Sequence, residues 1–278
     1  MVLIFFHGFR RTAGLADIWP VPLLDLICFV AHLYTLNLSH STVSCYISGM
    51  SFYHKVNDFE DTTQKFVIRK MIEGIKRSKS KRSDTRLPIS RDLLANILNY
   101  LPLVCSSHYE AKLFMATFSL AFHGLMRVGE LTVGNKSSDT HTISFHDVKI
   151  SNNILEVFIL SSKTDQLSKG MTLLVKAQAD RNIYPVALMA NYLKDHPLCR
   201  GPLFCHFDGN PLTRYQFSAL LKKSLSVLGI EQKSYKSHSF RISMATICSI
   251  EGMSDEQIKH LGRWKSDEAY LPYIRIPN

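Results

Sequence analysis

The spacing of apolar residues predicts helices over residues 21–75. The segment "VPLLDLICFVAHLYTL" (21–36) places apolar side chains at helical spacing after Pro22. "SHSTVSCYISGMSFYHKV" (39–56) begins with serine and threonine, which favour helix starts, and "TTQKFVIRKMIEGIKR" (62–77) repeats the apolar pattern. No strand-like alternation occurs here, so we expect a small helical domain over residues 1–80. The opening "MVLIFFHGFRRTAG" lacks the basic region of a signal peptide, and we expect this domain to be incomplete at its N-terminus.

A basic, serine-rich segment follows this domain. Residues 69–86 hold eight lysines and arginines against Glu73 and Asp84, and "RSKSKRSDTRLP" (77–88) has no apolar period. This composition is typical of a linker, which we place at residues 81–88. Two interpretations stay open: a basic strap on a phosphate backbone or a nuclear-import signal, and a solvated hinge. The candidate DNA-binding residues of the strap are Lys76, Arg77, Lys79, Lys81, Arg82 and Arg86.

The pattern changes twice within residues 89–278, which we expect to form a second domain. "ISRDLLANILNYL" (89–101) predicts a helix capped by Ser90, and "SSHYEAKLFMATFSLAFHGLMRVGEL" (106–131) is apolar nearly all round, as in a central buried helix. "HTISFHDVKI" (141–150), "NILEVFIL" (153–160) and "MTLLVKA" (171–177) then predict a three-stranded antiparallel sheet. Helices resume at "YPVALMANYLKDH" (184–196). The fold class is therefore mainly α (α+β).

Charge and cysteine usage narrow the class of protein. The net charge of +10 and the pI of about 9.3 favour a polyanionic partner. The six cysteines form no CxxC pair, and the group Cys199, Cys205 and His206 matches no common zinc module, so we expect reduced thiols in an intracellular protein. No apolar run reaches the roughly 18 residues that a membrane span needs. Motifs for nucleotide binding, catalytic zinc or serine hydrolysis are absent from the sequence.

Residues 238–275, "HSFRISMATICSIEGMSDEQIKHLGRWKSDEAYLPYIR", are rich in side chains that suit phosphate chemistry. Metal-free cleavage of a phosphodiester needs a nucleophile, cations that hold the charge on the phosphate oxygens, and an acid for the leaving oxygen. Arginine suits the second task because its charged fork matches two phosphate oxygens. Lysine suits the third, since its pKa falls in a cationic site. Tyrosine can attack phosphorus and leave a covalent phosphotyrosine.

From about residue 21 to 275 the sequence resembles the tyrosine recombinase (phage integrase) family. The resemblance lies in "GLMRVGEL" (124–131), "SSKTDQ" (161–166), "HSFR" (238–241), "LGRW" (261–264) and "YIR" (273–275), in the family's order. Trp264 and Tyr273 are nine residues apart, as is usual in the family, whereas His260 precedes "LG" and falls out of register. The resemblance implies that the catalytic residues are Arg127, Lys163, His238, Arg241, Trp264 and Tyr273, supported by Glu130.

The same resemblance implies a mechanism and partners. Tyr273 would form a 3′-phosphotyrosine, Lys163 would protonate the 5′ oxygen, and His238 would assist proton transfer from the tyrosine. The two arginines and Trp264 would hold the phosphorane. The helical domain would be the family's core-binding domain, forming a C-shaped clamp on double-stranded DNA with the catalytic domain. Family members act as dimers on one site and tetramers on two duplexes, without metal or ATP. The style of "LGRWKSD" resembles recombinases of eukaryotic mobile elements, which would place the protein in a nucleus.

Several alternatives remain at the level of sequence. Tyr270 is a second candidate nucleophile, Lys169 a second candidate acid, and Trp264 suits an apolar core as well as a phosphate site. Pro272, directly before Tyr273, is expected to remove a helix hydrogen bond and kink the chain. As functions, a recombinase-derived DNA-binding protein that no longer cuts, a type IB topoisomerase and, least favoured, a metal-dependent transposase compete with a recombinase.

Overall fold

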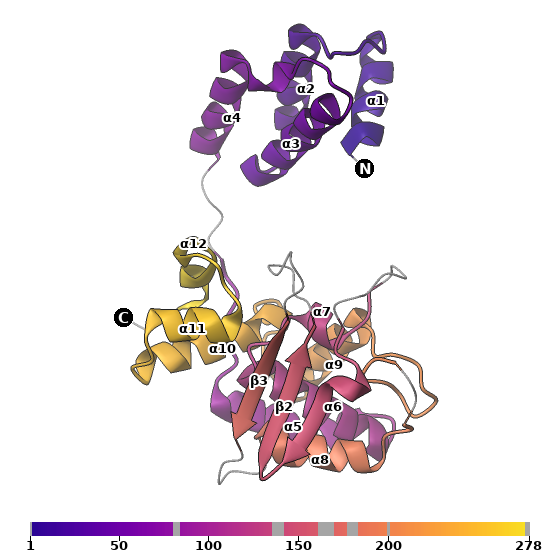
Figure 1. Cartoon of the computed structure of the whole chain (residues 1–278), viewed down its shortest axis with the longest axis vertical. Coiled ribbons are helices and arrows are strands. Elements are labelled where there is room, and N and C mark those ends of the chain that lie inside the picture. Colours follow the sequence, from indigo (N-terminus) through magenta and orange to yellow (C-terminus); the bar gives the residue numbers. More distant parts are fainter. Residues whose placement is uncertain are drawn as a thin grey trace. The chain divides into compact units, whose positions relative to one another are not determined.

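The computed structural model describes residues 2–79, 84–134, 142–160, 170–176, 183–198 and 201–275. The chain divides into two units, Met1–Asp84 and Thr85–Asn278, each with a hydrophobic core of its own (Figure 1). Across the described ranges, none of the helices is both long and apolar enough to cross a membrane.

The first unit is helical, as its apolar spacing predicts. Its helices are α1 (Val2–Ala13), α2 (Leu23–Thr35), α3 (His40–Val56) and α4 (Phe66–Ser78), with a short 3₁₀ turn at Thr62–Gln64. Ser39 caps α3 by accepting a hydrogen bond from the Thr42 amide.

Helix α1 is a difference from the sequence prediction, which began the helices at residue 21. Phe6 is fully buried and packs edge-on against Phe29 of α2, with 4.9 Å between the ring centroids. Arg10, one turn later, is buried too, because its guanidinium lies over the Phe6 ring and pairs with Asp17 at 2.8 Å and Asp25 at 3.3 Å. Because a charged residue, Arg10, occupies a buried position, the apolar spacing that would predict this helix is interrupted in the sequence.

The second unit is built around α6 (His108–His123), whose residues from Ala116 to His123 are all buried. Helices α5 (Arg91–Val104), α8 (Pro185–Lys194) and α10 (Ser237–Ile250) contact α6, and α9 (Arg214–Val227) contacts α5. The buried, nearly all-apolar sequence of α6 is thus explained by packing on several sides. Ser90 caps α5 as predicted, by accepting a hydrogen bond from the Leu93 amide.

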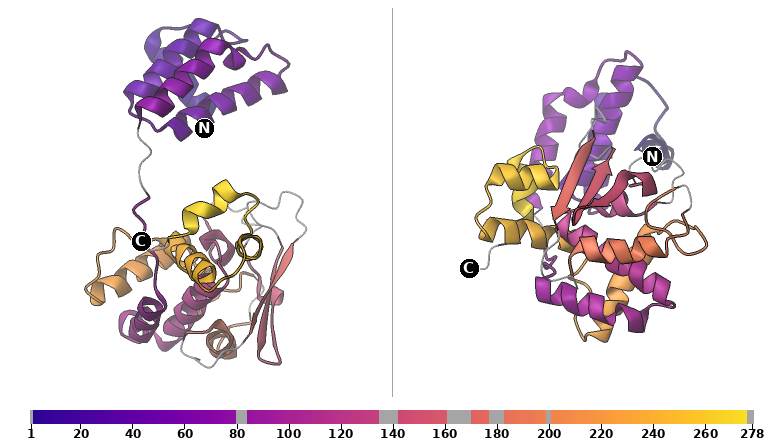
Figure 2. Two further views of the ribbon diagram at one scale, coloured as in Figure 1. Left: turned by 90° about the vertical axis from the view of Figure 1, so that its left-hand side faces the viewer. Right: turned by 60° about the horizontal axis from the view of Figure 1, so that its bottom comes forward.

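The predicted three-stranded antiparallel sheet is confirmed. Its strands are β1 (Val148–Ser151), β2 (Ile154–Ile159) and β3 (Met171–Lys176), in the order β1-β2-β3. Leu155, Val157 and Leu173 are buried on one face of the sheet, and β2 and β3 contact α8. The left view of Figure 2 shows the sheet at one edge of this unit, with the helices beside it. The period of two in strand sequences therefore places one face of the sheet on the core. The fold class, mainly helical with a small sheet, is also confirmed.

The C-terminal elements pack on the outer side of α10. They are α11 (Asp255–Gly262), α12 (Asp267–Tyr270) and a 3₁₀ turn at Leu271–Tyr273, drawn in yellow in Figure 1. A separate apolar cluster holds them together, and it consists of Leu125, Ala245, Cys248, Ile258, Trp264 and Tyr270. Because Leu125 belongs to the turn after α6, this cluster joins the end of the chain to the centre of the unit.

One buried histidine of this unit predicts a pH dependence of stability. His196 is 5% exposed, its Nε2 donates to the Leu203 carbonyl at 3.0 Å, and its Nδ1 accepts the Leu198 amide at 3.0 Å. Burial lowers the pKa of His196 below its usual 6.5, against the opposing effect of the Leu203 carbonyl. Below pH 6.5 the unfolded chain therefore binds a proton that the folded chain resists, and stability falls as the pH falls.

We expect His196→Gln to flatten this dependence. Chemical denaturation of both proteins between pH 7.5 and 5 should show that the free energy of unfolding falls more steeply for the wild type. The difference is at most about 1.4 kcal/mol per pH unit, the limit for one proton. Parallel curves for the two proteins would contradict the assignment to His196.

Candidate active site

The turn between α6 and α7 (Val128–Leu131) positions Arg127. Arg127 is the N-cap of α7, and Glu130 returns to it: Oε2 accepts the Arg127 amide at 2.8 Å and Oε1 accepts Nη1 at 3.1 Å. The Arg127 side chain is 18% exposed, whereas that of Glu130 is 3% exposed. The motif "RVGE" thus folds into one helical turn in which a buried carboxylate orients an arginine that water can reach.

Helix α10 carries His238 and Arg241 near its N-terminus, where unpaired backbone amides favour anions. Arg241 is 1% exposed and donates to the carbonyls of Leu125 and, at 2.8 Å, Gly262, while its Nε has no hydrogen-bond partner among the described residues. Burial, and then the positive charges of Arg127 and Arg263, lower the pKa of Arg241 to about 9. The group therefore keeps its charge at neutral pH.

Tyr273 lies against these side chains. Its hydroxyl is 3.1 Å from Nδ1 of His238, its ring is 4.9 Å from the Trp264 ring, and the Arg241 guanidinium carbon is 5.4 Å from its ring. Thr246, two turns along α10 from His238, donates its hydroxyl to the Tyr273 carbonyl at 3.2 Å. One helix thus holds both the main chain and the hydroxyl of Tyr273.

The structure accommodates Pro272 without interrupting a long helix. Helix α12 ends at Tyr270, and Pro272 stands in the first turn of the 3₁₀ segment that follows. At the start of a helix the backbone N–H that proline lacks would have no partner within the helix, so its absence costs little stability. The kink expected from the sequence is therefore a change of helix type that carries Tyr273 toward α10.

Tyr270, the alternative nucleophile, is placed very differently. It is 1% exposed and donates its hydroxyl to Oδ1 of Asp255 at 2.5 Å. Burial, and then the bond to the Asp255 carboxylate, raise the pKa of Tyr270 to about 12. A buried phenol beside a carboxylate is a poor nucleophile, so the geometry favours Tyr273.

Trp264 packs against Arg241 and Tyr273. It is 8% exposed, and its ring lies 4.5 Å from the guanidinium carbon of Arg241. The two sequence interpretations of Trp264, core residue and site residue, are compatible, because the same ring contacts Tyr270 of the apolar cluster and Tyr273.

Gly262 is the last residue of α11, and the residue that follows it, Arg263, takes the left-handed conformation, with φ of 57°. A Cβ on Gly262 would lie 1.7 Å from Cζ3 of Trp264. Glycine is required here because the indole ring folds back over the helix end.

We therefore expect Gly262→Ala to displace Trp264 from Arg241. Such overpacking costs about 1–3 kcal/mol of stability, which denaturation curves measure. Gly74→Ala is the matched control, because no atom of another group lies within 4 Å of its Cβ position, and it should be no less stable than the wild type. Wild-type stability of Gly262→Ala would contradict the packing of Trp264 against Gly262.

Arg263 is a site residue that the sequence prediction missed, although the motif "LGRW" contains it. Its Nη2 donates to Oε2 of Glu130 at 2.8 Å, so Glu130 is shared between Arg127 and Arg263. Burial lowers the pKa of Arg263, against the opposing charge of Glu130. Because these two partners are 133 residues apart, sequence spacing carries no signal for their contact.

The structure describes some, but not all, of the remaining predicted site residues. Lys163 and its alternative Lys169 lie outside the described residues, as do Lys81 and Arg82. Lys76 and Arg77 are exposed in the last turn of α4, and Arg86 is half-buried. Lys79 donates to the Leu38 carbonyl and lies 5.0 Å from the Tyr34 ring, so it is held on the first unit. Within the described ranges, no group of three or more His, Cys, Asp or Glu residues could hold a metal ion.

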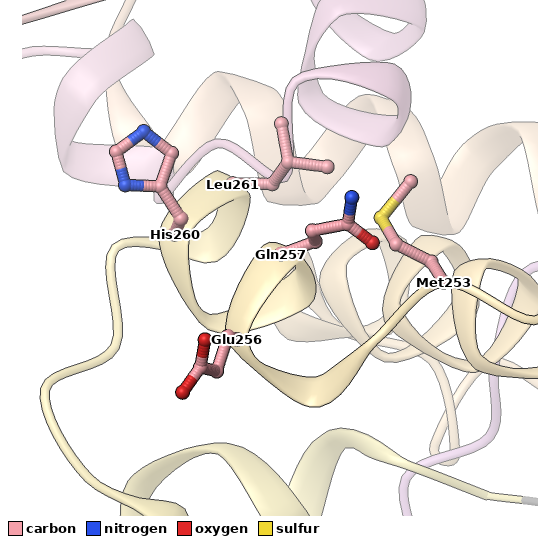
Figure 3. A pocket seen from close by; sticks show the side chains of 5 residues that line it. All are labelled: Met253, Glu256, Gln257, His260 and Leu261. Atoms are coloured by element: carbon pink, nitrogen blue, oxygen red, sulfur yellow. The ribbon is translucent and has the colours of Figure 1, made fainter.

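A pocket of about 440 Å³ lies on α11, and none of the candidate catalytic residues lines it (Figure 3). It is lined by Met253, Glu256, Gln257, His260 and Leu261. The structure therefore places His260 on the exposed side of α11, consistent with its position out of register in the sequence.

Known proteins resemble this chain over most of its length. A sequence model described as the phage integrase family matches residues 89–276. The integrase/recombinase xerD homolog of Selenomonas ruminantium is 23% identical over 256 residues, which cover 86% of this chain and 69% of that protein.

Solved structures resemble its fold. XerH site-specific recombinase in a post-cleavage complex with a palindromic difH substrate has a TM-score of 0.63 at 15% identity, over 99% of this chain and 73% of that chain. The Tn1549 transposon integrase in complex with transposon right end DNA has a TM-score of 0.62 at 13% identity, over 100% of this chain and 87% of that chain.

Proposed function

Because the chain belongs to the phage integrase family, the tyrosine recombinases, we propose that it cuts and rejoins double-stranded DNA with Tyr273 as the nucleophile. One observation carries the proposal: the Tyr273 hydroxyl lies 3.1 Å from a histidine nitrogen and beside a buried, charged arginine. This is hydrogen-bond distance for transfer of the phenolic proton.

The proposed reaction conserves the energy of the DNA backbone. The Tyr273 oxygen bonds to phosphorus, the bond from phosphorus to the 5′ oxygen breaks, and a 3′-phosphotyrosine remains. Nδ1 of His238 takes the phenolic proton, and Lys163 supplies a proton to the 5′ oxygen. A 5′ hydroxyl of a partner duplex then reverses these steps. Neither a metal ion nor ATP takes part.

Positive charge supports the proposed transition state. Arg127, Arg241 and the indole N–H of Trp264 would hold the extra negative charge on the non-bridging oxygens. Arg127 is the arginine that solvent reaches, at 18% side-chain exposure, so it is the first candidate to contact the phosphate. Arg241, at 1% exposure, would act through its charge and by holding the Trp264 and Tyr273 rings.

The partners and domains follow from the same proposal. We place a DNA-gripping domain at residues 1–80, a basic linker at 81–88 and the catalytic domain at 89–278, with dimers on one DNA site and tetramers on two duplexes. The net charge of +10 and the DNA complexes of XerH and the Tn1549 integrase support DNA as the partner. In a eukaryotic host the protein would act in the nucleus.

The test captures the covalent intermediate. Purified protein is incubated in EDTA with nicked duplexes taken from the DNA that flanks its gene, since a nick lets the cleaved fragment diffuse away. We expect an adduct that survives SDS, and mass spectrometry of its tryptic peptides should place the phosphate on Tyr273. Binding in gel shifts without any adduct would overturn cleavage in favour of a DNA-binding protein, and an adduct that needs a divalent metal would overturn the mechanism.

A further inference from the structure

Arg263 is a charged residue in an unusual backbone conformation and in an almost closed environment. Its side chain is 6% exposed, and its φ of 57° is one that side chains other than glycine and asparagine rarely adopt. Nη2 donates to Glu130 and, at 2.9 Å, to the Leu125 carbonyl, and Nη1 donates to the Leu261 carbonyl at 3.1 Å. The guanidinium thus compensates for the backbone conformation by binding two separate turns of the unit.

These contacts reach Arg127 by two routes. Oε2 of Glu130, which accepts from Arg263, also accepts the Arg127 amide at 2.8 Å. The carbonyl of Arg263 itself accepts from Nη2 of Arg127 at 3.1 Å. Side chain and main chain of Arg263 therefore both restrain Arg127, the arginine of the site that solvent reaches.

The contacts also join the other side of the site. The Leu125 carbonyl accepts from Arg263 and from Arg241, and the Gly262 carbonyl accepts from Arg241 at 2.8 Å. The left-handed turn at Arg263 sends its own side chain toward Glu130 and the next residue, Trp264, over Arg241. One residue thus connects the Arg127 turn with the Trp264 turn.

Charge gives this connection a chemical consequence. Glu130 is 2% exposed and ion-paired with Arg127, so these two groups alone would be neutral overall. The second guanidinium on the same carboxylate leaves one net positive charge in the trio. A charge in a site with little water acts strongly on a nearby anion.

We propose that Arg263 is a positioning residue of the phosphate pocket, which balances Glu130 so that the charge of Arg127 remains available to the scissile phosphate. The inference rests on the proposed function, since it needs a phosphate to act on. It assigns a role to a residue with a 6% exposed side chain that acts through its contacts with Glu130 and Arg127.

The test compares two substrates and three variants in single-turnover cleavage, corrected for the folded fraction of each protein. Arg263→Gly removes the guanidinium but suits the left-handed backbone, and Arg263→Lys keeps the charge. The double variant Arg263→Gly with Glu130→Gln removes the carboxylate that has lost its partner. One substrate is the ordinary nicked duplex, and the other carries an uncharged methylphosphonate at the scissile position. Lys112→Gln, which breaks an ion pair with Asp195 away from the site, is the control.

On the ordinary duplex, we expect Arg263→Gly to cleave about a hundredfold more slowly than the wild type, and Arg263→Lys to stay within about tenfold. The double variant should cleave about tenfold faster than Arg263→Gly. The effects of the two substitutions are then not additive, as expected for residues that act through one another. On the methylphosphonate, the ratio of wild-type to Arg263→Gly rates should fall, because its transition state carries one negative charge fewer than that of the phosphodiester.

Equal losses on both substrates would overturn the proposal and leave Arg263 a purely structural residue, as would wild-type rates for Arg263→Gly. Failure of the proposed function looks different, because the wild-type protein itself would then form no adduct on the ordinary duplex.

Discussion

We expect Tyr273→Phe to abolish the SDS-resistant adduct with nicked DNA, while the protein stays folded and binds the duplex as the wild type does. This is the largest effect we expect, because phenylalanine removes the attacking oxygen and little else. The ring still packs on Trp264, and the Thr246 hydroxyl still holds the main chain at residue 273. The measurement is the amount of adduct on denaturing gels, with gel shifts to show that DNA binding is retained.

Tyr270→Phe is the matched control, since it deletes the same atom three residues away. It removes the bond to Asp255, and we expect it to lower the free energy of unfolding by about 1.5–3 kcal/mol, as is usual for a hydrogen bond to a charged group. The adduct should still form. If instead Tyr270→Phe loses the adduct and Tyr273→Phe keeps it, the assignment of the nucleophile is reversed.

Arg241→Lys has the second largest expected effect, a loss of about 10²–10³-fold in single-turnover cleavage. Lysine keeps a positive charge, but its single ammonium group cannot bridge the carbonyls of Leu125 and Gly262 while lying flat on Trp264. We expect the indole of Trp264 and the ring of Tyr273 to lose the guanidinium against which both of them pack. DNA affinity should change only a few-fold, because the buried guanidinium has 1% exposure and contributes little to the DNA-facing surface.

Arg91→Lys provides the same substitution at the surface. Arg91 pairs with Glu251 at 2.7 Å with a side chain that is 42% exposed, so the variant should keep the wild-type cleavage rate. Stability is measured for both variants, and rates are compared at a temperature where both are folded. An Arg241→Lys protein that cleaves at the wild-type rate would show that the guanidinium is not needed at this position.

Local patterns explain why so much of this unit could be predicted from the sequence. The alternation of apolar residues around Leu155 and Val157 reports the face of one strand, and Ser90 reports a helix start by its own hydrogen bond. The motif "HSFR" lies near the start of a single helix, so the spacing of His238 and Arg241 already fixes their relation. The gathering of these residues with Arg127, Trp264 and Tyr273 follows the family resemblance, whereas the catalytic roles themselves stay predictions.

What the sequence did not predict depends on contacts between distant segments. Helix α1 was missed because a buried arginine, Arg10, interrupts its apolar face, and its acidic partners lie in the loop and helix that follow. Arg263 was missed because its meaning depends on Glu130, far away in the chain, and on a left-handed turn that an arginine rarely adopts. Lys163, by contrast, remains a prediction, because it lies outside the described residues.

The hydrogen bond between Tyr273 and His238 lies within one chain, which has a consequence for genomes that carry several copies of this gene. Under the proposed function each copy of the protein supplies its own nucleophile to its own pocket. We therefore expect that a copy that has lost Tyr273 does not cleave, even when an intact copy is bound beside it. In a genome that carries both intact and decayed copies of the gene, the decayed products would occupy DNA sites without cutting them, and would thus restrain the intact enzyme.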